Sequence, residues 1–224
     1  MLGSGAALLL AASGLHGADP AQDAELIAVA EAGDLAALRR LLNAGVSVKA
    51  RDARGRTALL AATHANRVEA ARLLVAAGAD VNAKDAIEDS AFLYAGAEGR
   101  LEILKMTLAA GADLASTNRY GGTALIPACH HGHVETVREL LKTRIAVDQV
   151  NKLGWTALLE TVILGDGGAR YREIARLLLA SRANPALADR EGMTPYEHAR
   201  RRGPGHADMA ALLQAAMRRE KAMP

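Results

Sequence analysis

A short segment recurs along this chain at a fixed interval. Four copies align without gaps: RDARGRTALLAAT, KDAIEDSAFLYAG, TNRYGGTALIPAC and VNKLGWTALLETV. Their hydroxyl residues, Thr57, Ser90, Thr123 and Thr156, are each 33 positions apart, and a fifth copy, ADREGMTPYEHAR, places Thr194 after a spacing of 38. A period of roughly 20–50 residues is typical of arrays in which each unit packs against its neighbours. The repeat therefore predicts a solenoid.

Each unit has the pattern of two helices joined by a turn. The hydroxyl of Thr57, Thr123 or Thr156 precedes an apolar run, where it can accept a backbone N–H and begin a helix. A short polar turn follows, and then a second run has its apolar residues at helical spacing. Gly45 and Gly78 stand where a helix ends in a left-handed residue. The polar residues between one unit and the next suit a hairpin-like loop.

Composition limits both the core and the classes of partner. The 224 residues suffice for a sizeable core, and 50% are hydrophobic but only 3% aromatic, so we expect Ala, Leu and Val packing between close helices. A net charge of +2, from 27 basic and 25 acidic residues, is too balanced to indicate nucleic acid or an anionic membrane surface. The single cysteine, Cys129, excludes an intramolecular disulfide.

The first twenty residues, MLGSGAALLLAASGLHGADP, differ from the rest of the chain. They contain an apolar stretch and no charged side chain before Asp19, with small residues near Ala18, as in a secretory signal peptide. Export to a periplasm or the exterior is the favoured interpretation, and a disordered leader on a cytoplasmic protein is the alternative. The apolar stretch is too short to span a bilayer as a helix, so we expect no membrane insertion of the mature chain.

From about Asp23 to the C-terminus, the pattern resembles the ankyrin repeat in its spacing, its G-x-T-x-L start and its G-A-D-V-N ending. The resemblance implies an all-α repeat solenoid of about six helix-turn-helix units with hairpin-like loops, in a single domain over residues 21–224. The expected units are an N-terminal capping unit at about 22–51, full units at about 52–84, 85–117, 118–150 and 151–188, and a C-terminal capping unit at about 189–220.

The sequence departs from the usual repeat at two positions of the T-P-L-H motif, since the proline is kept only at Pro195 and the histidine is absent. The family's T-P-L-H becomes Thr57-Ala58-Leu59-Leu60, and leucine, isoleucine or glutamate replaces the histidine in the other copies too. The polar links that this histidine makes between neighbouring repeats are therefore absent. We expect packing to contribute more of the stability.

One cluster of side chains has the composition of a metal site. Cys129, His130, His131 and His133 lie within five positions, and zinc needs three or four nitrogen or sulfur ligands around one point. They fall at the end of one predicted helix and in a tight turn, without a second such cluster elsewhere. The favoured interpretation is a polar turn beside a buried thiol, with no metal and no cofactor. Metal handling by the three histidines is the less favoured alternative.

A second candidate is the stretch LGDGGARYRE, where about five residues, near 165–169, are inserted between the two helices of one unit. Its glycines lack the Lys-Ser/Thr that a phosphate loop requires. As a flexible loop it can extend a contact surface through Arg170 and Tyr171. A surface insertion without a function is the alternative.

The sequence lacks the common enzymatic motifs. We find no Gly-x-Ser-x-Gly, no His-Glu-x-x-His and no dinucleotide fingerprint after a strand. Acidic residues such as Asp52, Asp85 and Asp189 recur at a fixed position of the repeat, which indicates a structural role. We therefore predict a non-enzymatic protein that binds another protein, most simply as a monomer.

The resemblance implies where such a partner binds, because ankyrin arrays usually use the turn tips and the exposed side of the first helices. Tyr, Trp and Arg are enriched at binding hot spots. The alternative function is an inhibitor or immunity protein that blocks one enzyme or toxin through the same surface. The predicted partner-binding residues are Arg54, Arg56, His64, Ile87, Asp89, Glu98, Arg119, Tyr120, His130, His131, Lys152, Leu153, Trp155 and Tyr171.

Overall fold

The computed structural model describes residues 19–221, which contain twelve α-helices, one 3₁₀ helix and no strand. The expected leader, residues 1–20, falls almost entirely outside the described part, so export stays a prediction. Of the helices within this part, none combines the length and apolar character needed to cross a bilayer. The elements are α1 (Pro20–Ala32), α2 (Leu35–Asn43), α3 (Ala58–His64), α4 (Val68–Ala76), α5 (Ala91–Ala97), α6 (Leu101–Ala109), α7 (Leu125–His130), α8 (Val134–Leu140), α9 (Ala157–Ile163), α10 (Ala169–Ala180), α11 (Pro195–Arg201), η1 (Pro204–His206) and α12 (Ala207–Lys221).

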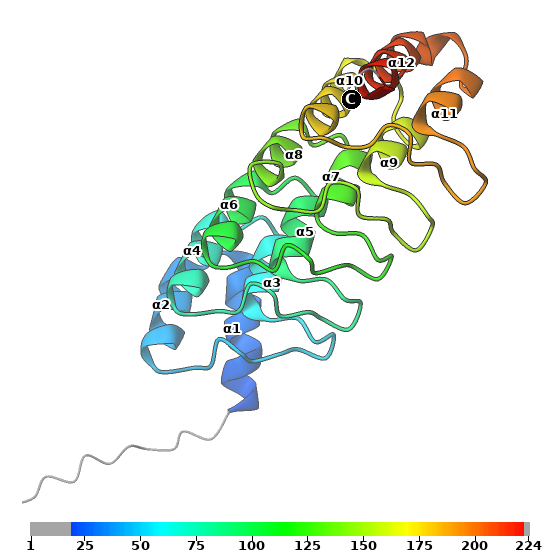
Figure 1. The fold of residues 1–224 in the computed structure, drawn as a ribbon. Coiled ribbons are helices and arrows are strands. Elements are labelled where there is room, and N and C mark those ends of the chain that lie inside the picture. Colours follow the sequence, from blue (N-terminus) through cyan, green and yellow to red (C-terminus); the bar gives the residue numbers. More distant parts are fainter. Residues whose placement is uncertain (1–18, 222–224) are drawn as a thin grey trace, which may run out of the picture.

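The helices form two parallel rows in one elongated array (Figure 1). The inner row is α1, α3, α5, α7, α9 and α11, and the outer row is α2, α4, α6, α8, α10 and α12. Each inner helix packs on the outer helix of the same unit, and each helix also packs on the next helix of its own row. The connecting hairpins all project from the same side of the array (Figure 1). The solenoid predicted from the repeat is therefore the observed fold.

Inner helices begin at the repeated hydroxyl residues, as predicted. The side chains of Thr57, Ser90 and Thr156 each accept the backbone N–H three residues later at 3.2 Å. In the last unit, Thr194 and Glu197 form a reciprocal capping box. Each cap satisfies a backbone donor that would otherwise be unpaired at the helix end.

Thr123 is the exception, and here the sequence prediction was wrong. Its hydroxyl is buried without a hydrogen-bond partner, and α7 begins two residues later, at Leu125. In the other copies the residue four positions after the cap donates its N–H to the cap carbonyl, but here that residue is Pro127, which has no N–H. The Thr123 carbonyl accepts from Ile126 instead, at 3.2 Å. Because the Ile126 N–H donates to this carbonyl, it does not donate to the Thr123 hydroxyl.

Replacing Pro127 with alanine should restore this cap. The new N–H can donate to the Thr123 carbonyl and free the Ile126 N–H for the hydroxyl, so we expect the free energy of unfolding to rise by about 1 kcal/mol. Urea unfolding followed by circular dichroism measures the change. Thr123→Val should cost little in the native sequence but about 1 kcal/mol in the Pro127→Ala background. Equal costs in both backgrounds would contradict the explanation.

Every hairpin is closed by the same side-chain contact. An Asp or Asn Oδ1 accepts the backbone N–H groups two and four residues later, over distances of 2.8–3.1 Å. This contact fixes the loop and orients the side chains at its tip. The structural role predicted for the repeated acidic residues is thus confirmed. The accepting residues are Asp52, Asp85, Asn118, Asn151 and Asp189.

Neighbouring hairpins are also joined by polar contacts, despite the missing histidine of the motif. Backbone hydrogen bonds of 2.9 Å link Ala86 to Arg54 and Lys152 to Tyr120. The side chains of Arg51 and Lys84 donate to carbonyls one repeat further along, at 2.6 and 2.7 Å. Neighbouring hairpins are therefore linked by hydrogen bonds although the motif's histidine is absent.

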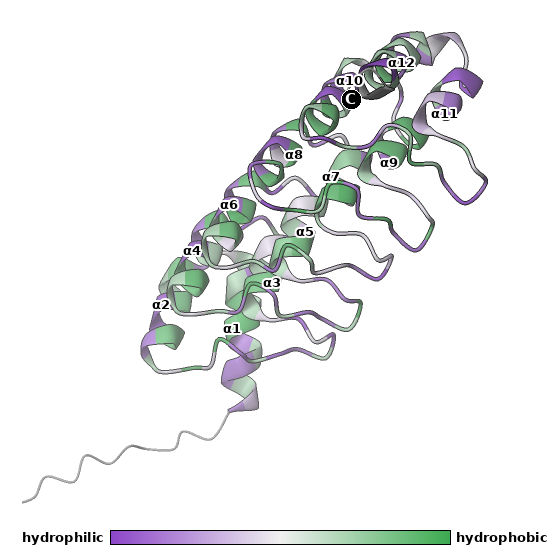
Figure 2. Cartoon of the chain, in the orientation of Figure 1, coloured by the Kyte–Doolittle hydropathy of each residue, from purple (hydrophilic) through white to green (hydrophobic). Residues whose placement is uncertain are grey.

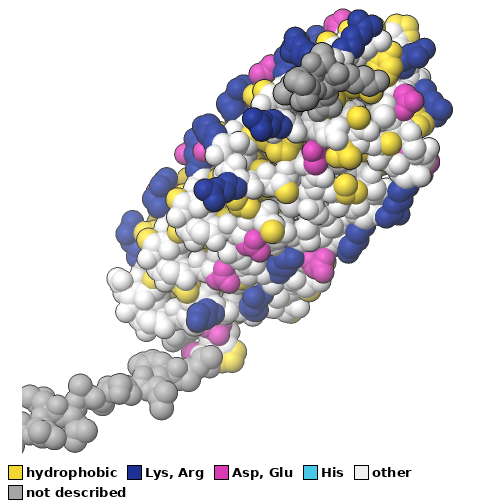
Figure 3. Space-filling model, in the orientation of Figure 1, with side chains coloured by type: hydrophobic (Ala, Val, Ile, Leu, Met, Phe, Trp, Pro, Cys, Tyr) yellow, Lys and Arg dark blue, Asp and Glu magenta, His cyan; other side chains and the backbone are white. Residues whose placement is uncertain are grey.

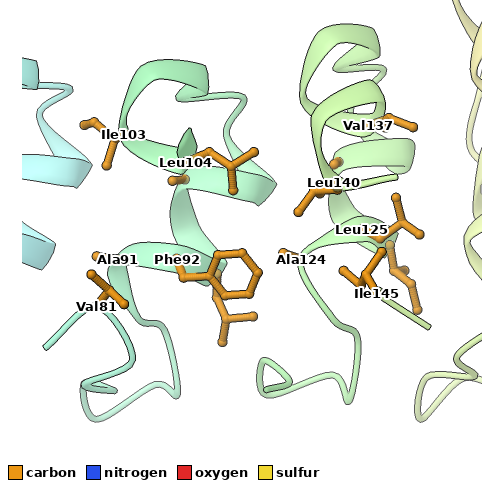
Figure 4. Packing of buried hydrophobic residues seen from close by; sticks show 14 of the residues in the cluster. Val81, Ala91, Phe92, Ile103, Leu104, Ala124, Leu125, Val137, Leu140 and Ile145 are labelled. Carbon is orange, nitrogen blue, oxygen red and sulfur yellow. The ribbon is translucent and has the colours of Figure 1, made fainter. Parts of the chain in front are cut away.

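The core runs between the rows and from unit to unit. Most helices carry hydrophobic stretches, and the loops contain both hydrophilic and hydrophobic residues (Figure 2). The ring of Phe92, which is fully buried, extends from α5 toward Ala124 at the start of the next unit (Figure 4). Gly96 lies so close to Ala124 that a Cβ at Gly96 would be 2.8 Å from the Ala124 Cβ. Small residues thus allow the inner helices to approach closely, as the composition predicted.

The inserted segment is packed against the C-terminal unit, so its interpretation as a flexible loop was wrong. The Gly165 carbonyl accepts a hydrogen bond from the Arg202 guanidinium at 3.0 Å and lies 3.3 Å from His206 Nε2. Tyr171 belongs to α10, is only 7% exposed, and donates its hydroxyl to the His130 carbonyl at 2.9 Å. Tyr171 therefore supports the end of α7 and is unavailable to a partner.

Candidate partner-binding groove

A hollow of about 390 Å³ crosses three consecutive units on the inner side of the array. Its floor is formed by α5, α7 and α9, and its outer wall by the hairpin tips that precede them. We call this hollow the groove. The residues of α5, α7 and α9 that line it are Tyr94, Ala97, Ile126, Pro127, His130 and Glu160.

The wall of the groove includes large apolar side chains that are exposed. The exposed fraction is 55% for Tyr120, 51% for Leu153 and 41% for Leu164. Ile87, at the tip of the preceding hairpin, is 51% exposed. Exposed apolar groups gathered beside a hollow mark a surface for interaction, whereas single scattered ones do not. The other long edge of the molecule, along the outer helices, carries many Lys and Arg side chains (Figure 3).

A carboxylate lies at the floor of the groove. Glu160 of α9 is 6% exposed, and its Oε1 accepts a hydrogen bond from Asn151 Nδ2 at 2.9 Å. Its Oε2 lies 3.6 Å from His130 Nδ1, which is too long for a hydrogen bond. Burial raises the pKa of Glu160 to about 7, and the Asn151 hydrogen bond and the nearby His131 offset only part of this effect.

The remaining charges of the groove are mostly acidic. Asp89 and Glu98 also line it, and burial raises the pKa of Asp89. Arg119 lies 3.6 Å from the Asp89 carboxylate and covers the Tyr120 ring at 4.8 Å. The groove therefore contains three carboxyl groups and one guanidinium, and the guanidinium already lies beside Asp89.

The rings of His130, His131 and His133 follow one another at the end of α7, with the His130 and His131 ring centroids 4.6 Å apart. His131 Nδ1 lies 2.7 Å from the Ala97 carbonyl, and the His131 and His133 rings meet edge to face at 5.8 Å. Burial lowers the pKa of His130 and of His133, which favours their neutral forms. Among residues 19–221, no three His, Cys, Asp or Glu side chains are grouped so that they could hold a metal ion.

Cys129 is fully buried, as predicted, and burial raises the pKa of its thiol far above the usual range. The thiolate is the nucleophilic form, so this thiol is inert at neutral pH.

The predicted partner-binding residues have different places in the structure. The groove brings seven of them together, whereas Arg54, His64, Ile87, Lys152 and Trp155 lie beyond its lining, with Trp155 partly buried. The seven are Asp89, Glu98, Arg119, Tyr120, His130, His131 and Leu153. Besides Tyr171, Arg56 was interpreted wrongly, because its side chain is 12% exposed and contacts Asp52 and Glu31 at 2.8 and 3.1 Å. These two ion pairs hold Arg56 inside the N-terminal end of the array.

Sequence reasoning missed Glu160, Asn151 and Tyr94. A signal for Glu160 was present, because alignment of the repeats places Ala61, Tyr94 and Pro127 at its position, and only Glu160 is charged among them. Charged residues are rarely buried unless they are paired, so a glutamate at this position indicates a candidate functional residue.

Known proteins show the same repeat over most of this length. The family model for ankyrin repeats (three copies) matches residues 5–85 and 92–185. The chain belongs to the ankyrin repeat family. Ankyrin repeats are generally modules of protein–protein interaction, which is the class of function that the sequence predicted.

Two solved ankyrin repeat structures are similar over nearly their whole length. An ankyrin repeat domain from Acinetobacter baumannii AYE is 54% identical, with a TM-score of 0.83, over 86% of this chain and 97% of that one. The ankyrin repeat protein EF0377 is 38% identical, with a TM-score of 0.81, over 84% and 96%. The ankyrin repeat protein YahD of Escherichia coli (strain K12) is 47% identical over 58 residues, 26% of this chain and 28% of that relative's length.

The raised pKa of Glu160 gives a pH-dependent prediction for Glu160→Gln. Between the unfolded pKa of 4.5 and the folded value of about 7, only the unfolded chain releases this proton, so the native protein loses stability as the pH rises. Glutamine keeps the acceptor for Asn151 and removes the charge. We expect the variant to gain on the order of 2 kcal/mol relative to the native protein between pH 5 and pH 8. Urea unfolding of both proteins at the two pH values measures this difference, and a constant difference would contradict the burial of the charge.

Proposed function

We propose that this ankyrin repeat protein binds a partner protein through the groove and the adjoining hairpin tips, and that it catalyses no reaction. The observation that carries the proposal is the groove itself. It combines exposed apolar side chains, Tyr120, Leu153 and Leu164, with a buried carboxylate beneath them. A rigid array supports it, so a partner can bind without ordering the surface first, and little conformational entropy is lost.

The test is affinity capture from the native source with the purified protein as bait. Tyr120→Ala combined with Leu153→Ala should reduce recovery of the partner at least tenfold, because both side chains are about half exposed and their truncation leaves the core intact. The matched control is Arg72→Ala combined with Lys105→Ala, which changes two exposed residues on the outer helices α4 and α6. Equal recovery of the partner with the two double variants would show that the groove is not the binding surface.

The same experiment separates a scaffold from an inhibitor or immunity protein. If the captured partner is an enzyme or a toxin, its activity is measured with and without one equivalent of this protein. A blocked activity identifies an inhibitor, whereas a scaffold leaves the activity unchanged.

A further inference from the structure

We propose that the groove receives an arginine or lysine side chain of the partner, with the cationic group against the Glu160 carboxylate. This inference rests on the proposed function and specifies its chemistry. The partner segment has one basic residue flanked by apolar residues, which cover Tyr120 and Leu153.

The first argument is the incomplete pairing of Glu160. Its carboxylate is more than nine-tenths buried, yet only Oε1 accepts a hydrogen bond, from Asn151. Within the described part of the chain, Oε2 accepts no hydrogen bond, the His130 Nδ1 atom lies 3.6 Å from it, and Glu160 lines the groove. A buried carboxylate is costly unless a donor or a cation satisfies it. The Oε2 atom of Glu160 can therefore accept a hydrogen bond from a partner side chain that enters the groove.

The second argument is that no cation of the array itself takes this position. His130 and His131 of the preceding unit face Glu160, and burial favours the neutral form of His130. Cys129 is the remaining titratable neighbour, and its thiol is protonated. Arg202, the residue that follows α11, donates to the carbonyls of Ile163 and Gly165 instead. A cation that pairs with the ionised Glu160 carboxylate would therefore come from outside the chain.

The third argument is the chemistry of the surrounding walls. The groove that Glu160 lines is also lined by the aromatic residues Tyr94 and Tyr120 and by the apolar residues Ile126 and Leu153. Lys and Arg have long apolar stems that pack on such walls while the charged end reaches further, and aromatic faces attract cations. Glu98 and the Asp89 carboxylate add negative charge, which disfavours an acidic guest. The apolar surface continues past the hollow to Ile87, which favours a side chain carried on a polypeptide over a small free cation.

The test is selection of peptides from a random phage-displayed library on the native protein and on Glu160→Gln. Peptides selected on the native protein should share one Arg or Lys flanked by apolar residues. Synthetic copies should bind the native protein at least tenfold more tightly than Glu160→Gln, and replacing the basic residue with glutamine should cause the same loss. The matched control is Glu135→Gln, an exposed carboxylate on α8, which should bind like the native protein.

The outcomes separate this inference from the proposed function. Peptides that need Tyr120 and Leu153 but carry no basic residue, or bind Glu160→Gln equally well, overturn the inference and leave the groove as a binding surface. Peptides that are insensitive to Tyr120→Ala and Leu153→Ala overturn both. Selection of no peptide, together with Glu160-dependent binding of spermidine, overturns the polypeptide guest in favour of a small cation.

Discussion

Leu74→Asp is expected to lower the free energy of unfolding by about 4 kcal/mol or more. Leu74 lies on α4 and is fully buried where the outer helices α2, α4 and α6 pack in sequence. An aspartate there loses the apolar contacts of the buried cluster and places a charge among hydrophobic side chains. In an array, stability is the sum of unit and interface terms, so damage at one unit also weakens its two interfaces.

Urea unfolding followed by circular dichroism measures the effect, with Ala76→Asp as the control. Ala76 lies two residues further along the same helix but is exposed, so its replacement should cost no more than about 1 kcal/mol. A two-step transition, in which the N-terminal units unfold first, would also agree with nearest-neighbour coupling. An unchanged midpoint for Leu74→Asp would contradict the packing between the outer helices.

Features that depend on neighbouring residues could be predicted from the sequence. The caps at Thr57, Ser90 and Thr156 involve residues only three positions apart, and the hairpin contacts span only four. Because the segment recurs along the chain, the same cap and the same hairpin contact can be expected in each copy. The failure at Thr123 was local as well, because Pro127 stands four positions after it, and the missing N–H could have been anticipated.

The chemistry of the groove could be predicted only in part. Tip residues such as Tyr120 and Leu153 follow from the register of the repeat, since every hairpin has the same shape. The groove is built from three units, and the contacts of Glu160 involve two of them, through Asn151 of its own unit and His130 of the preceding one, so no single repeat contains them. Tyr171 shows the same limit, because its hydroxyl contacts a carbonyl 41 positions earlier in the chain.

Gly165→Ala should lower the free energy of unfolding by about 3 kcal/mol, which is at the upper end of the usual cost of over-packing. An alanine Cβ would overlap the Thr161 carbonyl oxygen and lie 2.6 Å from the Tyr171 ring. Neither group can move freely: Thr161 is part of α9, and the Tyr171 hydroxyl is bound to the His130 carbonyl. Relief of the clash therefore requires α10 to shift away from α9.

The control for this variant is Gly205→Ala, because nothing lies within 4 Å of a Cβ built there. It should change the free energy of unfolding by less than about 0.5 kcal/mol. If Tyr171 shifts, the end of α7 loses a hydrogen bond at His130, a residue that lines the groove. Gly165→Ala should then weaken partner binding although Gly165 itself lies outside the groove. Native stability in this variant would show that the inserted segment is mobile, and that its contacts with α10 and α11 do not hold the C-terminal unit in place.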